Sequence, residues 1–128
     1  MLPPDLHEPF ASAEARSHAA QQLLERCQLL EELQRLAALP SDQWPQEQIE
    51  RFPSSTEGHP KQSAERLDRW RALFAGELRQ VRDTRNAAAH GRISDVELRT
   101  AVYLAERLLA AAYGRSLLKQ TPPDANEY

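Results

Sequence analysis

Disulfides, zinc clusters and membrane-length apolar runs are all missing from this sequence. Its one cysteine, Cys27, has no partner for an internal bridge, and no Cys/His grouping has the spacing of zinc ligands. The longest uninterrupted apolar run covers residues 108–113, whereas a membrane-spanning helix needs about 20 residues. The first residues lack the basic and apolar regions of a secretory signal. We therefore expect a cytoplasmic protein with no metal, no cofactor and no membrane contact.

Glycine and β-branched residues are also few, which disfavours a β-sheet. Only 4 glycines occur in 128 residues, whereas the long runs consist of Ala, Leu, Arg and Glu, which are good helix formers. The 9 prolines lie mostly at the two ends and in one central stretch, where they separate elements. The sequence predicts a single all-α domain over residues 1–128, built as a helical bundle of three long helices plus one or two short ones.

The first long helix is expected between Ser12 and Leu39. Its apolar positions follow helical spacing and cover a face wide enough for partners on two sides, with members Ala20, Leu23, Leu24, Cys27, Leu29, Leu30, Leu33, Leu36 and Ala37. Such a face favours bundle packing and a homodimer. Outside the long helices, we expect a Pro-rich lead-in at 1–11, a connector at 40–62 and a polar tail at 120–128.

Within the connector, three apolar side chains stand among prolines. Trp44, Ile49 and Phe52 are expected to anchor a short helical turn against the bundle. The stretch 54–60 combines Ser, Gly and Pro and is typical of an exposed loop.

The second long helix is expected to open near Ser63. Its inward stripe steps by three or four residues through Leu67, Trp70, Phe74, Leu78 and Val81. The next position in that stripe is Arg85. A charge in this register must pair, or extend its head to solvent, and Glu106 and Asp83 are the candidate partners.

Signals that end one helix and start the next lie close together. Gly91 tolerates the left-handed conformation that closes a helix, and Ser94 with Glu97 forms a capping box. We expect the third helix to begin there and end near Gly114, with an amphipathic extension to Lys119. Its core face is predicted to comprise Leu98, Ala101, Val102, Ala105, Leu108, Leu109 and Ala112.

Charge is unevenly distributed along the chain. The net charge of −3 argues against general coating of nucleic acid, yet residues 63–92 carry 7 Arg against 4 acidic residues. Arginine presents a planar fork that fits phosphate. The high Arg content of the whole chain by itself has the simpler explanation of genomic base composition.

The segment 81–92 carries the residues suited to chemistry. On a helix, Arg82, Asn86 and His90 share a face, whereas Arg85 and His90 diverge by about 140°. They converge on one phosphate only if the helix ends near His90 or a second chain completes the site. Histidine exchanges protons near neutral pH and arginine stabilises phosphoryl charge. The set therefore fits metal-independent RNA cleavage, with one histidine from each chain of a symmetric dimer.

Arg85, Asn86 and His90, with three alanines between the last two, resemble the Arg-x4-His motif of the HEPN superfamily (higher eukaryotes and prokaryotes nucleotide-binding domains). This resemblance implies a dimerising helical bundle and a metal-independent endoribonuclease, of the kind found in toxin–antitoxin, phage-defence or CRISPR-linked systems. It makes Arg85 and His90 catalytic and RNA the substrate, and it gives Asn86 the role of orienting His90 or contacting RNA. Arg82 and Arg92, which lie in the basic segment around this motif, are expected to bind RNA together with Asn86. An antitoxin or effector protein is an expected partner.

A second hypothesis assigns no catalytic activity to the chain. The wide face of residues 20–37 would assemble the chain with itself or with a larger complex, as a non-catalytic interaction or oligomerisation module. His90 would then be a residue that caps a helix end, and Arg85 a charge whose stem packs against the core. Arg79, Arg82 and Arg92 would be solvated surface charges, and the overall acidity fits this hypothesis.

Overall fold

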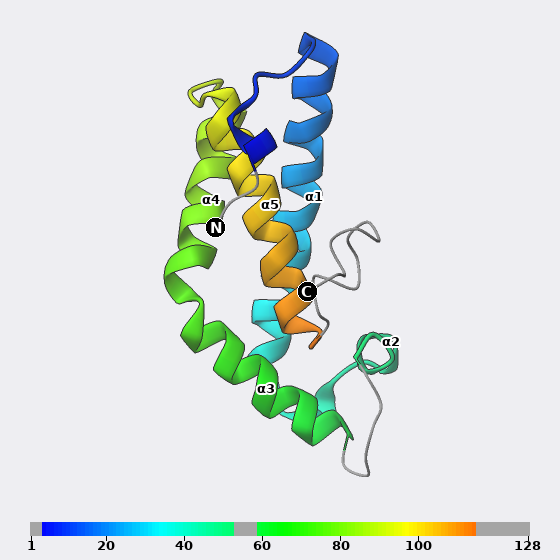
Figure 1. Ribbon diagram of the computed structural model, residues 1–128. Coiled ribbons are helices and arrows are strands. Elements are labelled where there is room, and N and C mark those ends of the chain that lie inside the picture. The colour runs from blue at the N-terminus through cyan, green and yellow to red at the C-terminus, as the bar shows by residue number, and fades with distance from the viewer. Residues whose placement is uncertain (1–3, 53–58, 115–128) are drawn as a thin grey trace, which may run out of the picture.

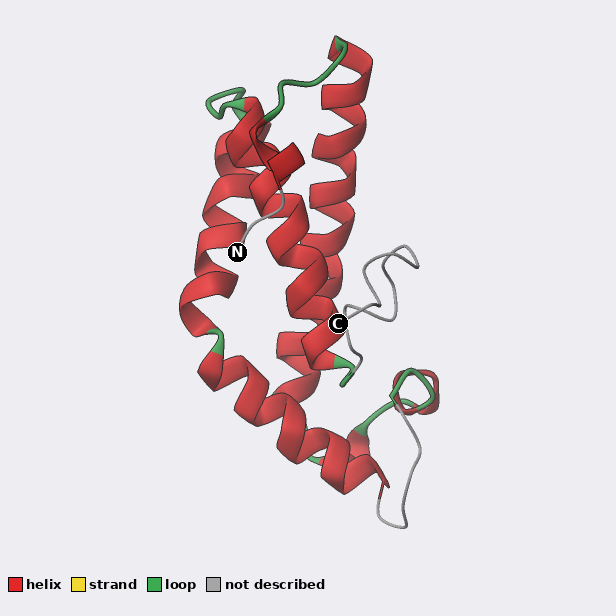
Figure 2. Cartoon of the chain, viewed as in Figure 1, coloured by secondary structure: helices red, strands yellow, loops and turns green. Residues whose placement is uncertain are grey.

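The computed structural model describes residues 4–52 and 59–114, and every regular element in these ranges is helical (Figures 1 and 2). No strand occurs in the described residues, so the all-α prediction is confirmed. The elements are η1 (Pro4–His7), α1 (Ala13–Ala37), η2 (Ser41–Gln43), α2 (Gln46–Ile49), α3 (His59–Leu73), α4 (Ala75–Ala89) and α5 (Asp95–Ala112), where η marks a 3-10 helix.

The second long helix is divided, so that the described chain has four long helices and not three. Phe74, with φ −105° and ψ 21°, leaves helical geometry between α3 and α4, and Figure 1 shows the two helices meeting at a bend. Gly76, a weak helix former, lies next to the break. The bend lets α3 pack on α1 and η2 while α4 packs on α1 and α5. In addition, α3 begins at His59, four residues before the predicted Ser63.

The core lies between α1, α4 and α5, with α3 covering one end. It buries the stripes expected for the long helices, and its most enclosed large side chains are Leu23, Leu33, Leu67, Leu98 and Val81. Phe74, Val102 and Leu109 are only partly buried. The buried face of α1 is narrower than predicted, because Leu24 and Leu29 at its two edges remain 37% exposed.

The turn between α4 and α5 has the predicted chemistry. Gly91 adopts φ 67°, its N–H donates to the carbonyl of Ala88, and the N–H of Arg92 donates to the carbonyl of Ala87. These two bonds make a Schellman motif, which satisfies carbonyls at the end of α4. The capping box of Ser94 and Glu97 then opens α5. The chain therefore reverses direction within a few residues.

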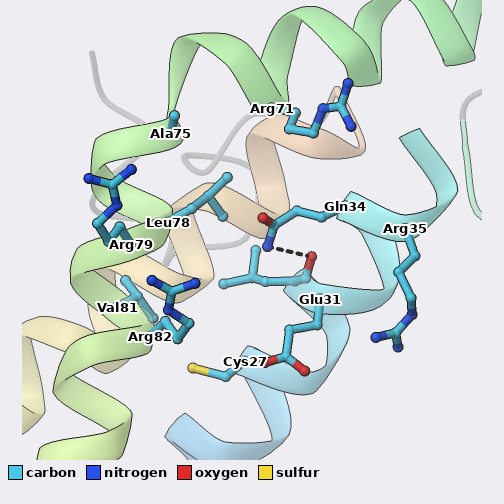
Figure 3. Close-up of a pocket in the computed structure, with 11 residues that line it drawn as sticks. Cys27, Glu31, Gln34, Arg35, Arg71, Ala75, Leu78, Arg79, Val81 and Arg82 are labelled. Atoms are coloured by element: carbon cyan, nitrogen blue, oxygen red, sulfur yellow. Dashed lines mark hydrogen bonds between the residues drawn. The ribbon is translucent and has the colours of Figure 1, made fainter. Parts of the chain in front are cut away.

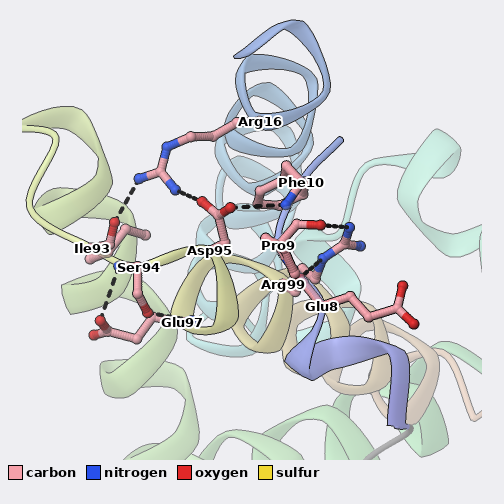
Figure 4. A network of polar contacts seen from close by, with 9 residues as sticks. All are labelled: Glu8, Pro9, Phe10, Arg16, Ile93, Ser94, Asp95, Glu97 and Arg99. Carbon is pink, nitrogen blue, oxygen red and sulfur yellow. Dashed lines mark hydrogen bonds and ion pairs between the residues drawn. The ribbon is translucent and has the colours of Figure 1, made fainter. Parts of the chain in front are cut away.

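The lead-in is docked on α5 (Figure 4). The N–H of Phe10 donates to Asp95 over 2.9 Å, and Arg16 pairs with the same carboxylate. Arg99 donates to the carbonyl of Glu8 over 2.8 Å and lies 4.2 Å from the centre of the Phe10 ring. These contacts fix the segment before α1 against the start of α5.

The connector is anchored as predicted. Trp44 and Phe52 are buried, Ile49 is partly buried, and the rings of Trp44 and Phe52 lie 5.4 Å apart. Phe52 also contacts the ring of Tyr113, at 5.0 Å, beyond the end of α5. Most of the expected loop at 54–60, the extension to Lys119 and the tail at 120–128 lie outside the described residues.

We expect Gly91→Ala to lower the free energy of unfolding by about 1 kcal/mol, because alanine is strained at this positive φ. Gly76→Ala is the matched control. Nothing lies within 4 Å of its added Cβ, and it should raise the free energy by about 0.5 kcal/mol through better helix propensity. Urea denaturation followed by circular dichroism measures both. Equal effects of the two substitutions would contradict the assigned turn.

Asp95→Asn should loosen the docked segment, so that chymotrypsin cuts after Phe10 faster than in the wild type. The hydrogen bond from Phe10 and then the charge of Arg16 hold the pKa of Asp95 below its usual range. Its stabilising contribution is therefore present at neutral pH and is lost as the pH falls below about 4 through the lowered pKa. The amide resonance of Phe10 should shift over that acidic range. Unchanged cleavage in Asp95→Asn, with Asp42→Asn as control, would refute the docking role.

Candidate functional site

Arg85 lies on the face of α4 that approaches α1. Its side chain is 25% exposed, and its guanidinium is 3.6 Å from the carboxylate of Glu31 on α1. The same guanidinium donates to the amide oxygen of Asn86 over 3.0 Å. The prediction that this charge pairs was correct, but the partners were wrong. Glu106 pairs with Arg26 and Asp83 with Arg82.

His90 is more exposed than Arg85. It is the C-terminal cap residue of α4, where its backbone N–H approaches the carbonyls of Ala87 and Ala88. Its ring is exposed and makes no hydrogen bond with any described residue, so the cap is made by backbone and not by the imidazole. The ring is therefore available to a ligand or to a second chain.

The structure brings together only part of the predicted set. Arg85 and Asn86 are bonded to each other, but no hydrogen bond joins Arg85 to His90 within the described residues. Since α4 stays helical up to Ala89, these two side chains leave the helix about 140° apart. Arg92 follows Gly91 and is exposed. A single chain therefore presents Arg85 and His90 as separate groups.

Arg82 belongs to a groove between α1 and the α3–α4 bend (Figure 3). The groove has a volume of about 400 Å³. Four arginines and a single carboxylate contribute to its lining, which comprises Cys27, Leu30, Glu31, Gln34, Arg35, Arg71, Ala75, Leu78, Arg79, Val81 and Arg82. In Figure 3, Arg82 extends from α4 into the space beside Cys27 and Glu31. The groove is thus basic in a chain that is acidic overall.

The pKa of the Cys27 thiol depends on burial and on two charges at the edge of this groove. Burial raises the pKa of its thiol to about 11, the charge of Arg85 acts in the lowering direction, and Glu31 raises it further. Cys27 is therefore a protonated core thiol at neutral pH, as expected for a small buried residue.

Sequence reasoning did not identify Arg35, Arg71 or Glu31 as site residues. Glu31, Gln34 and Arg35 are three and four residues apart on α1, a spacing that places them on one face and was the available signal. Which element that face meets depends on the packing of α1 against α4, which periodicity alone does not give.

No group of three or more His, Cys, Asp or Glu side chains among residues 4–52 and 59–114 has an arrangement that holds a metal ion. Within those ranges, every helix is too short or too polar to cross a bilayer. Comparison with family models, with curated proteins and with solved structures found no match to this chain.

The reactivity of Cys27 tests where Arg85 and Glu31 lie. At pH 9, a pKa of about 11 leaves about one thiol in a hundred ionised, so alkylation by iodoacetamide should be at least about tenfold slower than in the unfolded chain. Glu31→Gln should speed the reaction and Arg85→Gln should slow it, because each removes one charge effect on the thiol. Mass spectrometry gives the rates, and Arg92→Gln is the control. The same rate in all variants would contradict the placement of these charges.

Proposed function

We propose that this protein is a metal-independent endoribonuclease of the HEPN type that works as a homodimer. The observation that carries the proposal is the second half of α4, where a half-buried Arg85 precedes an exposed His90. The first half of the same helix contributes to a groove lined by four arginines. The all-helical frame and the helix end at Gly91 support the same family resemblance.

In this proposal Arg85 and His90 have different tasks. Arg85 exchanges its 3.6 Å partner Glu31 for the scissile phosphate, whose developing charge it stabilises. His90 of one chain removes the proton of the ribose 2′-hydroxyl, and the same residue of the second chain protonates the leaving 5′-oxygen. The 2′-oxygen attacks phosphorus and the P–O5′ bond breaks. The products are a 2′,3′-cyclic phosphate and a 5′-hydroxyl.

A symmetric dimer is part of the proposal for a geometric reason. Each chain offers one exposed imidazole at the end of α4, and that imidazole points away from the Arg85 of the same chain. A two-fold axis near the ends of two α4 helices would supply two histidines to one cleft. RNA is the substrate, and an antitoxin or effector protein that restrains the enzyme in a toxin–antitoxin, phage-defence or CRISPR-linked system belongs to the same proposal, as does a cytoplasmic location.

We expect the purified protein to cleave end-labelled RNA in EDTA, and His90→Ala and Arg85→Ala each to lower the rate by at least about 100-fold, because each removes a group that acts in the transition state. Gel electrophoresis and end-group analysis give the rate and the cyclic phosphate. His18→Ala, which alters another exposed histidine, should cleave at the wild-type rate. Circular dichroism should show an unchanged helical fold in His90→Ala, since its ring is exposed.

Equal cleavage by wild type, Arg85→Ala and His90→Ala would contradict the assignment of Arg85 and His90 as catalytic residues.

No cleavage by the wild-type dimer, at any RNA concentration, would favour the second function, a non-catalytic helical interaction module. The specific observation in favour of that function is the exposure of large apolar side chains. Leu73 is 74% exposed at the bend, and Leu24, Leu29 and Leu39 are also exposed.

A further inference from the structure

The groove between α1 and the α3–α4 bend has a strong local excess of positive charge. Of its four arginines, Arg35 and Arg79 have no ion pair with any described residue. Arg71 pairs with Asp68 at 2.7 Å, and Arg82 pairs with Asp83 at 3.7 Å, in both cases between largely exposed side chains. Exposed pairs of this kind contribute little energy, so all four guanidinium groups are available to an anion.

The floor of the groove is apolar and contains no aromatic ring. Leu30, Leu78, Val81 and Cys27 line it, and the side-chain amide of Gln34 is engaged with the carbonyl of Leu30 over 3.2 Å. A site that reads nucleobases uses aromatic platforms for stacking or free amides for hydrogen bonding. The lining therefore suits the charged backbone of a ligand better than its bases.

The basic row continues along α4 beyond the groove as far as Arg85. Arg79, Arg82 and Arg85 follow one another at steps of three residues, each about 4.5 Å along the helix axis. Glu31, the one carboxylate of the groove, is also the ion partner of Arg85. A polyanion that follows this row runs from the groove to Arg85, the residue that would hold the scissile phosphate.

From these observations we propose that the α1/α4 groove binds the phosphate backbone of single-stranded RNA through Arg35, Arg71, Arg79 and Arg82, and that Glu31 weakens this binding. The inference rests on the proposed ribonuclease function, because it makes the groove the site that guides substrate to Arg85 and His90. It gives roles to Arg35, Arg71 and Arg79 on grounds of position and charge. A guanidinium fork matches two phosphate oxygens, so arginine suits this ligand.

The test measures binding of fluorescein-labelled 2′-O-methyl RNA, which has no free 2′-hydroxyl and cannot be cut by this chemistry. We expect Arg35→Gln and Arg79→Gln each to weaken binding about fivefold at moderate salt. Each should also reduce the slope of log K against log salt by about 0.7, the value for one phosphate contact of a single strand. Glu31→Gln should tighten binding about threefold. Fluorescence anisotropy over a salt series gives all of these values.

The matched control is Arg69→Gln, which removes the same charge from an exposed position of α3 outside the groove and should bind like the wild type. Equal weakening by Arg69→Gln, or no weakening by the groove variants, would overturn the proposal. Displacement of the RNA by poly-L-glutamate as readily as by unlabelled RNA, at equal charge, would also overturn it and would assign the groove to an acidic protein.

The same experiment separates this inference from the proposed function. If the protein binds 2′-O-methyl RNA through the groove but fails to cut ordinary RNA, the result supports RNA binding in the groove and contradicts the ribonuclease function. If cleavage depends on Arg85 and His90 but RNA binding does not depend on Arg35 and Arg79, the result supports the ribonuclease function and contradicts RNA binding in the groove. Circular dichroism of Arg35→Gln and Arg79→Gln should match the wild type, because both side chains are exposed.

Discussion

The reversal of the chain at Gly91 is the constraint on which the rest of the structure depends. A left-handed glycine closes α4 and a capping box opens α5 a few residues later, so the two helices must pack side by side. That packing turns one face of α4 toward α1 and the core, and leaves the last residue before the glycine in solvent. The exposure of His90 and the burial of the Arg85 stem are therefore two results of one turn.

The pair of Arg85 and Glu31 resolves a conflict that this geometry creates. Arg85 continues the stripe of Leu78 and Val81, so its stem is drawn toward the core while its charge requires a polar partner. Glu31 supplies that partner from α1 without full burial of either group, which avoids the large desolvation penalty of an enclosed ion pair. A pair that is partly solvated can also exchange partners, as a phosphate-binding arginine must.

Local signals predicted the helices well because their information lies within a few residues. The N-terminal cap of α1 at Ser12, the closing Gly91 and the capping box of Ser94 each depend on neighbours along the chain. The bend at Phe74 did not follow from periodicity, since the apolar stripe continues in step across it and the bend is set by packing on α1, η2 and α5. For the same reason the partner of Arg85 was missed. Glu31 lies 54 positions away, on a helix whose rotation only the folded chain defines.

An acidic protein with one basic groove has a physical advantage over a protein that is basic throughout. With a net charge of −3, the protein as a whole repels a polyanion, and salt screens the attraction of the groove's arginines beyond about 10 Å. In the proposed complex, by contrast, a strand in the groove would meet a lining that has four arginines against a single carboxylate. The proposed groove would thus retain productive contact while the net charge opposes non-specific adsorption. Glu31 connects the two parts of this proposal, because its carboxylate lines the groove and also pairs with Arg85. An RNA that occupies the groove as proposed would compete with Glu31 for Arg85.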